Sequence, residues 1–244
     1  IGAGPSGLTC GYYLARLGYD VDVFEQQPVA GGILAFGIPE YRLPIDVLNR
    51  EIKLIEQVGV KIHLNTEIGT DITFYQLKRD YDAIYIATGT QFSNKINIPG
   101  EELKGVYHGL DFLRDNNLGR DVKVGNTVAV IGGGNTAIDA ARTALRLGAK
   151  DVTILYRRTI DDMPADKREI ADALEEGIKI VPLVAPLRFM GTDRVKEIEC
   201  IRMELGDYDS SGRRKPKPIP GSEFTMKVDM VIPGVSQYSD LPFI

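Results

Sequence analysis

A glycine pattern that occurs twice constrains the fold of this sequence more than any other feature. Gly2-x-Gly4-x-x-Gly7 recurs in the second half of the chain as Gly132-x-Gly134-x-x-Ala137. In both copies a Leu-Gly pair, Leu17-Gly18 or Leu147-Gly148, ends the helical run that follows, at the same distance from the first glycine of the pattern. A β-branched strand comes next, which is the order expected in a dinucleotide-binding βαβ unit. The sequence therefore contains two copies of one such unit.

The rest of the sequence alternates between strand-like and helix-like periodicity, as in α/β proteins. Helices are expected at residues 7–17, 46–58, 135–147 and 166–176, and strands at 21–24, 61–64, 83–87, 128–131 and 152–156. Strands at 195–205 and 224–232, joined by a polar turn at 207–220, predict an antiparallel hairpin or meander. The predicted fold class is α/β, with two Rossmann-like dinucleotide-binding domains and this antiparallel part.

Each glycine turn has the chemistry of a pyrophosphate site. The first glycine makes the tight turn, the second lets the backbone approach the phosphates, and the third packs the helix against the strand. The phosphates would bind at the N-terminus of the helix, where N–H groups are free and the helix dipole is positive. Structural coincidence is the alternative, but the helix and strand that follow each turn argue against it.

The residues at the ends of the two strands distinguish the copies. Glu25 closes the first strand, and a carboxylate there accepts hydrogen bonds from ribose and repels a 2′-phosphate. The second strand closes with Tyr156, followed by Arg157 and Arg158. Two guanidinium groups favour a 2′-phosphate, and thus NADP over NAD. The alternative is a solvated arginine pair at the end of a strand.

Two different dinucleotides in one chain are typical of a flavin enzyme that exchanges electrons with a nicotinamide. FAD is expected in the first copy and NADPH in the second. Hydride passes directly between the two cofactors, so no protein acid, base or nucleophile is required. We therefore expect no catalytic residue and no metal ligand. His63 and His108 stand in no motif with a carboxylate or cysteine and are expected to be ordinary loop or strand residues.

Three motifs in order resemble one family. They are the loop at residues 31–44, the second glycine turn at 132–139, and Tyr156-Arg157-Arg158 with Met163-Pro164-Ala165. The chain resembles the small (beta) subunit of NADPH-dependent glutamate synthase over nearly its whole length. It is also similar to the flavin module of dihydropyrimidine dehydrogenase and to the large subunit of NADH-dependent ferredoxin:NADP oxidoreductase.

The resemblance implies a set of cofactor-binding residues. For FAD the set is Gly2, Ala3, Gly4, Pro5, Ser6 and Gly7 at the pyrophosphate, Glu25 at the ribose, Gly32 and Ile33 at the flavin, the closing turn Ala87, Thr88 and Gly89, and further Gln26, Arg42, Ile68 and Gly234. For NADP it is Gly132, Gly133, Gly134, Asn135, Thr136 and Ala137 at the pyrophosphate, with Arg157 and Arg158 on the 2′-phosphate. A surface arginine in a long loop is the alternative for Arg42.

The same resemblance predicts how the domains are arranged. Residues 1–104 would form the first part of the FAD domain, residues 105–232 an inserted NADP domain, and residues 233–244 a truncated return to the FAD domain. The chain is expected to be a fragment, because family members continue into a Gly-Asp segment. They also carry an N-terminal domain with cysteine-bound iron–sulfur clusters, which we expect in a missing region or in a partner. The segment Gly234–Gln237 departs from the family, which tends to place glycine directly before the glutamine.

Composition and charge narrow the classes of function that remain possible. The net charge of −5, from 29 basic and 34 acidic residues, argues against a nucleic-acid surface. No apolar run approaches the length of a membrane span. Cys10 and Cys200 form no CxxC motif, as expected in the reducing cytoplasm and unlike a thiol-disulfide reductase. The basic stretch Arg213–Pro218 is interpreted as a solvated hairpin turn, with a docking site for a partner subunit as the alternative.

The predicted function is hydride transfer between NADPH and FAD, with electrons passed through iron–sulfur clusters to a redox partner subunit, such as the large subunit of glutamate synthase. Electron flow in the reverse direction fits the residues equally well. The flavin subunit of an electron-bifurcating ferredoxin:NADP or hydrogenase-type complex is an alternative. So are a disulfide reductase, a flavin monooxygenase and a non-catalytic nucleotide-binding subunit.

Overall fold

The chain folds into two compact units. The computed structural model describes residues 1–209 and 212–243. Unit 1 contains residues 1–92 and the last residues from Gln237 on, and unit 2 contains Ser93–Ser236. Unit 2 is thus inserted in unit 1, as the predicted fold class requires. The chain enters unit 2 before the predicted boundary at 104 and leaves it after the one at 232. Residues 93–104 belong to unit 2 because Ile96, Ile98 and Leu103 pack against its core.

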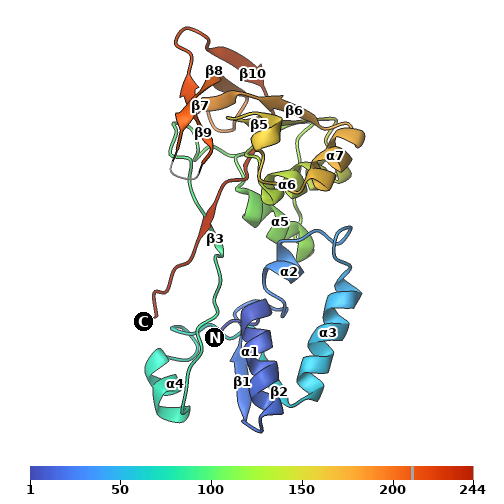
Figure 1. Cartoon of the computed structure of the whole chain (residues 1–244), viewed down its shortest axis with the longest axis vertical. Coiled ribbons are helices and arrows are strands. Elements are labelled where there is room, and N and C mark those ends of the chain that lie inside the picture. Colours follow the sequence, from blue (N-terminus) through green and yellow to red (C-terminus); the bar gives the residue numbers. More distant parts are fainter. Residues whose placement is uncertain (210–211, 244) are drawn as a thin grey trace. The chain divides into compact units, whose positions relative to one another are not determined.

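Unit 1 is built on a small parallel sheet against which two of its helices pack (Figure 1). Strands β1 (Val21–Phe24) and β2 (Val60–His63) pair in parallel. The helices are α1 (Pro5–Arg16), α2 (Ile33–Phe36), α3 (Ile45–Gln57) and α4 (Phe74–Asp80). The core contains Ala3, Leu8, Val23, Ala35, Leu48, Ile52 and Val60. Two short strands, β3 (Phe92–Ser93) and β12 (Gln237–Tyr238), pair where the chain passes between the units.

The predicted strand at 83–87 is not a strand in the structure. Its neighbour is Ile1, whose N–H donates to Tyr85 O at 2.7 Å and whose carbonyl accepts from Ala87 N–H at 2.8 Å. These two bonds follow the parallel pairing pattern, but a single paired residue does not make a ladder.

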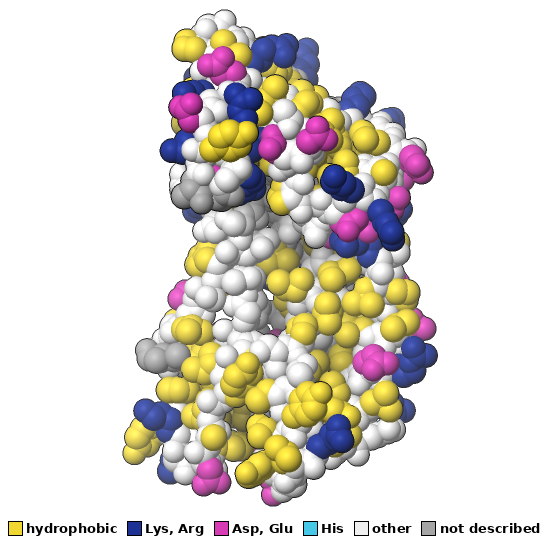
Figure 2. All heavy atoms as spheres, viewed as in Figure 1, with side chains coloured by type: hydrophobic (Ala, Val, Ile, Leu, Met, Phe, Trp, Pro, Cys, Tyr) yellow, Lys and Arg dark blue, Asp and Glu magenta, His cyan; other side chains and the backbone are white. Residues whose placement is uncertain are grey.

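Large apolar side chains remain exposed in unit 1. Tyr13, Leu17 and Tyr19 are 58%, 74% and 64% exposed, and Leu54 on α3 is 50% exposed. Figure 2 shows hydrophobic side chains gathered over the helices of this unit. Contiguous exposed apolar surface is uncommon on a protein that works alone.

Unit 2 has three layers, with a parallel sheet in the middle. The sheet has the order β11-β4-β5-β6, formed by β4 (Thr127–Ile131), β5 (Asp151–Tyr156), β6 (Lys179–Pro182) and β11 (Met230–Pro233). Helices α5 (Gly109–Asn117), α6 (Asn135–Arg146) and α7 (Lys167–Glu175) cover one face, and a 3-10 turn spans Ile160–Asp162. Four alanines of α6, Ala137, Ala140, Ala141 and Ala144, are fully buried, so the helix lies close to the sheet.

An antiparallel sheet covers the other face. Its order is β10-β8-β7, with β9 paired to β8, and the bounds are β7 (Val184–Met190), β8 (Glu197–Tyr208), β9 (Arg214–Pro218) and β10 (Phe224–Lys227). Successive residues of β4 alternate between the two cores: Val128 and Val130 face the helices, while Ala129 and Ile131 face the antiparallel sheet. Both cores thus share the central sheet.

Two sequence interpretations in this region are wrong. The predicted strand at 224–232 is two strands, because the Asp229 carboxylate accepts the N–H groups of Asn126 and Thr127 at 3.1 and 3.0 Å. This contact turns the chain from the antiparallel sheet into the parallel one. The stretch Arg213–Pro218, interpreted as a turn, contains strand β9, whose prolines are tolerated because it lies at an edge of the sheet.

Within the described ranges, no helix is both long enough and apolar enough to cross a membrane.

An ion-pair cluster joins α6 to α7. Arg142 is 6% exposed and contacts Glu169, and its Nη2 lies 2.7 Å from Glu176 Oε1. Arg146 Nη1 donates to Glu176 Oε2 at 2.7 Å. Hydrogen bonds from Arg146 and Arg142, reinforced by their charge, lower the pKa of Glu176 to about 2. The carboxylate is therefore more stable ionised in the folded chain than in the unfolded one.

The contribution of Glu176 to stability has a defined pH range. Because the folded pKa is lower than the unfolded one, the contribution is complete above about pH 4.5 and is lost as the pH falls toward 2. Glu176→Gln is expected to lower the free energy of unfolding by about 1–2 kcal/mol at neutral pH. The gap from wild type should shrink between pH 4.5 and pH 2 in urea unfolding. Asp172→Asn, which removes a half-exposed carboxylate 3.3 Å from Arg142, is the matched control with a smaller effect. An unchanged gap at low pH would contradict the assignment.

Candidate functional site

The first glycine turn is closed by main-chain contacts that leave no room for side chains. Gly2 has φ +98°, and its N–H donates to Phe24 O at 2.8 Å. A Cβ on Gly2 would lie 2.5 Å from Ala87 O, and one on Gly7 would lie 2.0 Å from Gly2 O. Helix α1 begins directly after Gly4, an N-cap residue that has no side chain to satisfy the N–H groups of the first turn. These N–H groups are therefore available to an anion.

A hollow of about 480 Å³ adjoins this turn. Ten predicted site residues line it: Gly2, Gly4, Pro5, Ser6, Glu25, Gly32, Ile33, Ala87, Thr88 and Gly89. The loop at Gly32 approaches the turn closely, since a Cβ on Gly32 would lie 2.8 Å from Gly4 Cα. Gly32 also has φ +58°, so glycine is needed there both for its conformation and for the close approach.

Glu25 is fixed at the end of β1 by the backbone. Its side chain is buried, with the residue 3% exposed. Oε2 accepts the Ala3 N–H at 2.8 Å, and Oε1 accepts the Gln27 N–H at 2.9 Å. Each oxygen has a further lone pair. The carboxylate is thus held in place as an acceptor at the rim of the hollow.

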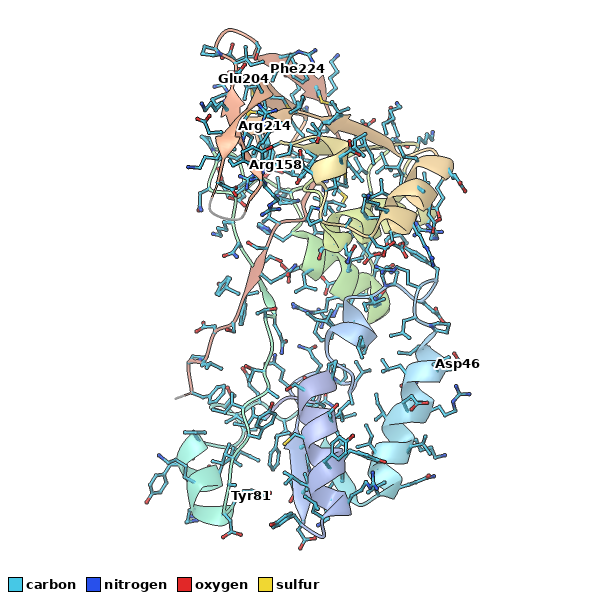
Figure 3. All side chains as sticks on the ribbon, in the orientation of Figure 1. Asp46, Tyr81, Arg158, Glu204, Arg214 and Phe224 are labelled. Atoms are coloured by element: carbon cyan, nitrogen blue, oxygen red, sulfur yellow. The ribbon has the colours of Figure 1, made fainter. Side chains whose placement is uncertain are left out.

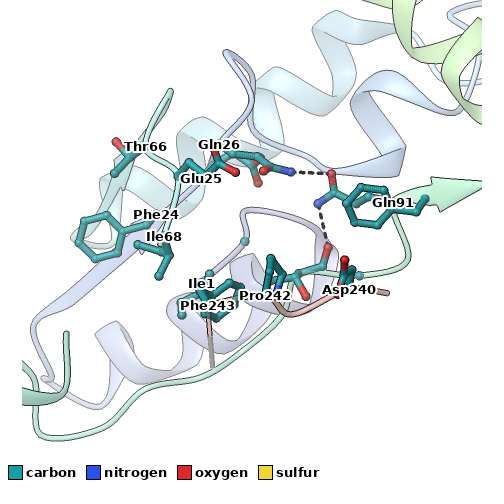
Figure 4. Close-up of a pocket in the computed structure, with 15 residues that line it drawn as sticks. Ile1, Phe24, Glu25, Gln26, Thr66, Ile68, Gln91, Asp240, Pro242 and Phe243 are labelled. Carbon is teal, nitrogen blue, oxygen red and sulfur yellow. Dashed lines mark hydrogen bonds between the residues drawn. The ribbon is translucent and has the colours of Figure 1, made fainter. Parts of the chain in front are cut away.

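A second hollow of about 90 Å³ lies beside Glu25 (Figure 4). Gln26 and Ile68, both predicted, line it. Gln26 Nε2 donates to Gln91 Oε1 at 3.0 Å, and Gln91 Nε2 donates to Thr88 O at 2.8 Å. Sequence reasoning missed Gln91, because it belongs to no motif and reaches the site only through its side chain. Arg42, in contrast, lines neither hollow; its N–H donates to Pro39 O at 2.9 Å.

The second glycine turn repeats the geometry of the first. Gly132 has φ +137°, its N–H donates to Leu155 O at 3.1 Å, and a Cβ on it would lie 2.4 Å from Gly234 O. Helix α6 begins directly after Gly134, again without a capping side chain. Gly234 thus takes the place over Gly132 that Ala87 takes over Gly2. The sequence assigned Gly234 to the returning FAD segment, but it lies in unit 2.

The middle of the second turn is packed differently. A Cβ on Gly133 would lie 2.6 Å from the ring of Tyr156, so the tyrosine fills the space beneath the turn. The Tyr156 hydroxyl donates to Asp162 O at 2.9 Å. Ala165 N–H donates to Gly133 O at 3.1 Å, and Asp166 N–H donates to Asn135 Oδ1 at 3.0 Å. The motif at 163–165 therefore supports the turn from outside.

The two arginines after β5 differ in exposure and in partners. Arg157 is exposed, whereas Arg158 is 5% exposed. Arg158 Nε donates to Arg214 O at 2.8 Å, and its Nη2 donates to Asp209 Oδ2 at 3.0 Å. Figure 3 labels Arg158 and Arg214, which lie close together at the end of β5 and on β9. Sequence reasoning missed Asp209, which is far from its partner along the chain.

Neither the two cysteines nor the two histidines belong to a glycine turn, and one of them, Cys200, is packed in a core. Cys10 is on α1 in unit 1, and Cys200 is buried on β8 in unit 2; both are free. Burial raises the pKa of Cys200 to about 12. His63 Nε2 lies 2.6 Å from Asp22 Oδ1, and His108 Nε2 lies 3.6 Å from Glu101 Oε1. Both histidines thus have a carboxylate neighbour that no motif indicated, and neither lines a hollow described above.

Comparison with known proteins yields one family and several relatives. The family model described as pyridine nucleotide-disulphide oxidoreductase matches residues 1–235. The chain is 49% identical over 248 residues to NADP(+)-dependent formate dehydrogenase subunit beta of Moorella thermoacetica, covering 100% of this chain and 35% of that protein. It is 42% identical over 242 residues to glutamate synthase (NADPH) small chain of Halomonas elongata, covering 95% and 51%. The predicted resemblance to the glutamate synthase small subunit is confirmed, and the chain spans a third to a half of these relatives.

A solved structure has the same fold. FprA of Mycobacterium tuberculosis in complex with NADPH matches with a TM-score of 0.82 and 22% identity, over 99% of this chain and 70% of that one. At this identity the likeness concerns the fold alone. Together with the parallel sheets of both units, it confirms the predicted α/β class with two Rossmann-like parts.

Proposed function

Because the chain belongs to the pyridine nucleotide-disulphide oxidoreductase family, we propose that it binds FAD in unit 1 and NADP(H) in unit 2 and that hydride passes between them. One observation carries the proposal: the same glycine turn is built twice, but a buried carboxylate ends the strand in unit 1 and a tyrosine with a following exposed arginine ends it in unit 2. A carboxylate suits an unphosphorylated ribose, and an arginine suits a 2′-phosphate. NADP(H) also appears in the names of both relatives.

The residues of unit 1 fit FAD. The hollow of about 480 Å³ is within the range of small-molecule sites. The first turn of α1 would bind the pyrophosphate with N–H donors, and Glu25 would accept hydrogen bonds from ribose hydroxyls. Gly32 and Ile33 would line the flavin side, with Ala87–Gly89 closing the site and Gln26 and Ile68 beside the ribose. Arg42 lines neither hollow, and its proposed contact with FAD would form only when the cofactor binds. A bound flavin accepts hydride from a nicotinamide and releases electrons singly.

The residues of unit 2 fit a nicotinamide dinucleotide. Gly132–Ala137 would bind its pyrophosphate at the N-terminus of α6, which has no capping side chain. Gly234 keeps the turn closed, and the arginine pair after β5 would bind the 2′-phosphate. In neither unit does this chemistry require an acid, a base or a metal ligand from the protein.

Electrons would leave through iron–sulfur clusters in a further segment or in a partner subunit. Two observations support a partner: the chain spans only 35% and 51% of its relatives, and apolar side chains such as Leu17 and Tyr19 remain exposed in unit 1. A large subunit of the glutamate synthase type and another iron–sulfur oxidoreductase are both compatible with this proposal. The free thiols fit a cytoplasmic setting.

The family name suggests an alternative, a thiol-disulfide mechanism, which would require a pair of reactive cysteines. Variants of the two cysteines of the chain test this alternative. Cys10 and Cys200 belong to different units, and the raised pKa of Cys200 keeps its thiol protonated. The double variant Cys10→Ser/Cys200→Ala is expected to keep NADPH-dependent reduction of ferricyanide within about twofold of wild type, a change below about 0.5 kcal/mol in the barrier. Loss of this activity in a variant with an unchanged melting temperature would restore the disulfide-reductase interpretation.

The test of the proposed function is to identify the flavin and the preferred nicotinamide. Denaturing the purified protein should release FAD rather than FMN. Steady-state reduction of ferricyanide should proceed with a higher kcat/KM for NADPH than for NADH, and without stoichiometric oxygen consumption. A colourless protein, a preference for NADH, or oxygen use that matches NADPH oxidation would each contradict the proposal.

A further inference from the structure

Tyr156 stands at the position in unit 2 that Glu25 has in unit 1. In both units the N–H of the first turn glycine donates to a carbonyl of the strand, that of Phe24 or that of Leu155. The residues that come next, Glu25 and Tyr156, are therefore equivalent positions of the repeat. Both are buried, with 3% and 6% of the residue exposed. One is an acid and the other is neutral, so a role that they share does not depend on charge.

Each of these two side chains reaches the second residue of its glycine turn. Glu25 Oε2 accepts the N–H of Ala3 at 2.8 Å. The equivalent residue in unit 2 is Gly133, and a Cβ on it would lie 2.6–2.9 Å from three ring atoms of Tyr156. The ring thus lies against the main chain of Gly133, in the space that a side chain there would need. A carboxylate holds the first turn by a hydrogen bond, and an aromatic ring holds the second by packing.

Tyr156 also fixes the segment 159–166, which follows β5 and contains the 3-10 turn. The Tyr156 hydroxyl donates to Asp162 O at 2.9 Å. Asp162 is tied into the same segment, because its Oδ2 accepts the Thr159 N–H at 3.2 Å. Met163, the next residue, is 7% exposed and belongs to the core on the helical side of the sheet. The tyrosine therefore links the end of β5 to a well-packed segment.

The end of the segment 159–166 binds the second glycine turn. The Ala165 N–H donates to Gly133 O at 3.1 Å, and the Asp166 N–H donates to Asn135 Oδ1 at 3.0 Å. Asn135 is the first residue of α6. Because the segment engages its amide oxygen, its amide NH2 group is left as a donor for a ligand. The segment thus orients a side chain at the helix terminus where the pyrophosphate is proposed to bind.

Unit 1 has the same contact beside its larger hollow. The Gly31 N–H donates to Ala3 O at 2.7 Å, which is the equivalent of the bond from Ala165 in unit 2. The residue after Gly31 is Gly32, which lines the hollow of about 480 Å³. The segment 159–166 therefore takes the place beside the second turn that the loop of Gly31 takes beside the first.

We infer that Tyr156 is a positioning residue for the pyrophosphate of NADP(H), and that it holds the second glycine turn and the segment 159–166 in the conformation that the nucleotide meets. It acts through Gly133 and Asn135 and does not itself touch the nucleotide. The inference rests on the proposed binding of NADP(H) in unit 2. A neutral anchor suits this unit, because a carboxylate at the same position would repel a 2′-phosphate.

The test measures the contribution of the pyrophosphate, with no electron transfer involved. The full chain, saturated with FAD, is titrated calorimetrically with two ligands that both carry the 2′-phosphate. One is 2′-phospho-ADP-ribose, which has the pyrophosphate, and the other is adenosine 2′,5′-bisphosphate, which has a single 5′-phosphate. Tyr156→Phe removes only the hydroxyl and should lower the ratio of the two affinities about two- to tenfold, as for the loss of one hydrogen bond.

Tyr107→Phe is the matched control. The Tyr107 hydroxyl donates to Asp115 on α5 in the same unit. The substitution therefore removes the same atom and one hydrogen bond, but at a place that does not contact the glycine turn. The ratio of affinities should stay at the wild-type value in this variant, even if the melting temperature falls.

Gly133→Ala tests the role of the ring. Gly133 does not have a left-handed φ, so alanine is strained there only by its contact with Tyr156. Gly133→Ala should lower the ratio at least as much as Tyr156→Phe does. In a Tyr156→Ala background, where the ring is absent, the same substitution should have little further effect.

Three results would overturn the inference. They are a ratio that is unchanged or higher in Tyr156→Phe at any melting temperature, an equal loss in Tyr107→Phe, and additive losses when Gly133→Ala is combined with Tyr156→Ala. Equal affinities of the wild type for the two ligands would be a different failure. That result would overturn the proposed pyrophosphate site in unit 2, on which the inference rests.

Discussion

Gly4→Val is expected to release FAD from the protein while leaving its fold intact. A Cβ on Gly4 would have Gly32 Cα, at 3.9 Å, as its nearest contact, and the residue's φ of −77° and ψ of 179° suit valine. The new side chain would instead occupy the place where the pyrophosphate approaches the backbone. Loss of two charge-assisted hydrogen bonds costs about 3–6 kcal/mol, or a 100-fold or larger loss of FAD affinity. Flavin released per chain on denaturation is the measurement.

Circular dichroism and the melting temperature of the flavin-free protein provide the control for folding. Gly4→Ala, with a smaller side chain, should retain an intermediate amount of flavin. A valine variant that keeps one FAD per chain would show that the pyrophosphate does not bind at the first glycine turn.

Gly134→Val makes the same change in the second copy of the turn and is expected to impair the binding of NADPH while leaving FAD bound. No described atom lies within 4 Å of a Cβ on Gly134, and its φ of −90° and ψ of 175° again suit valine. FAD should stay bound and remain reducible by dithionite. The KM for NADPH should rise by about 100-fold or more, for the same energetic reason as above.

Each of these two variants is the matched control of the other, because they alter equivalent positions of one repeat. If Gly134→Val released FAD, or if Gly4→Val raised the KM for NADPH without loss of flavin, the assignment of cofactors to units would be reversed. If both lost both functions, the two turns would not serve separate sites.

The parts of the fold that follow from local backbone geometry could be predicted from the sequence. Gly2 and Gly132 need a left-handed φ and the close approach of a carbonyl, and glycine spacing reports both requirements directly. The predicted strand at 21–24 coincides with β1, because β-branched residues and flanking turns mark it. Glu25 could be recognised for the same reason: its place is set by the strand that carries it.

The parts that depend on distant contacts could not be predicted. The break between β10 and β11 depends on Asp229, whose partners Asn126 and Thr127 lie in a distant part of the sequence. Strand β9 was hidden by its prolines, which suggest a turn until the edge position is known. The equivalence of Gly234 and Ala87 was recognised only in the structure, although an aspartate, Asp229 or Asp82, stands five residues before each of them and an apolar run follows it.

Prediction of the site from the sequence was limited in the same way. An arginine pair indicates affinity for an anion, but the sequence does not tell which guanidinium is already bound by the protein. Burial of Arg158 against Asp209 and exposure of Arg157 decide that question. Gln91, which bridges Gln26 and Thr88, was likewise visible only in three dimensions.

Hydride transfer from NADPH to FAD can be followed by anaerobic titration of the FAD-loaded protein with NADPH, because reduction of a flavin bleaches its absorbance without any further partner. Equimolar NADPH is expected to bleach the flavin, and NADH is expected to do so only at much higher concentration. If NADPH bound to the protein while the flavin stayed oxidised, hydride transfer between the two cofactors would be disproved and a nucleotide-binding subunit without catalytic activity would be favoured.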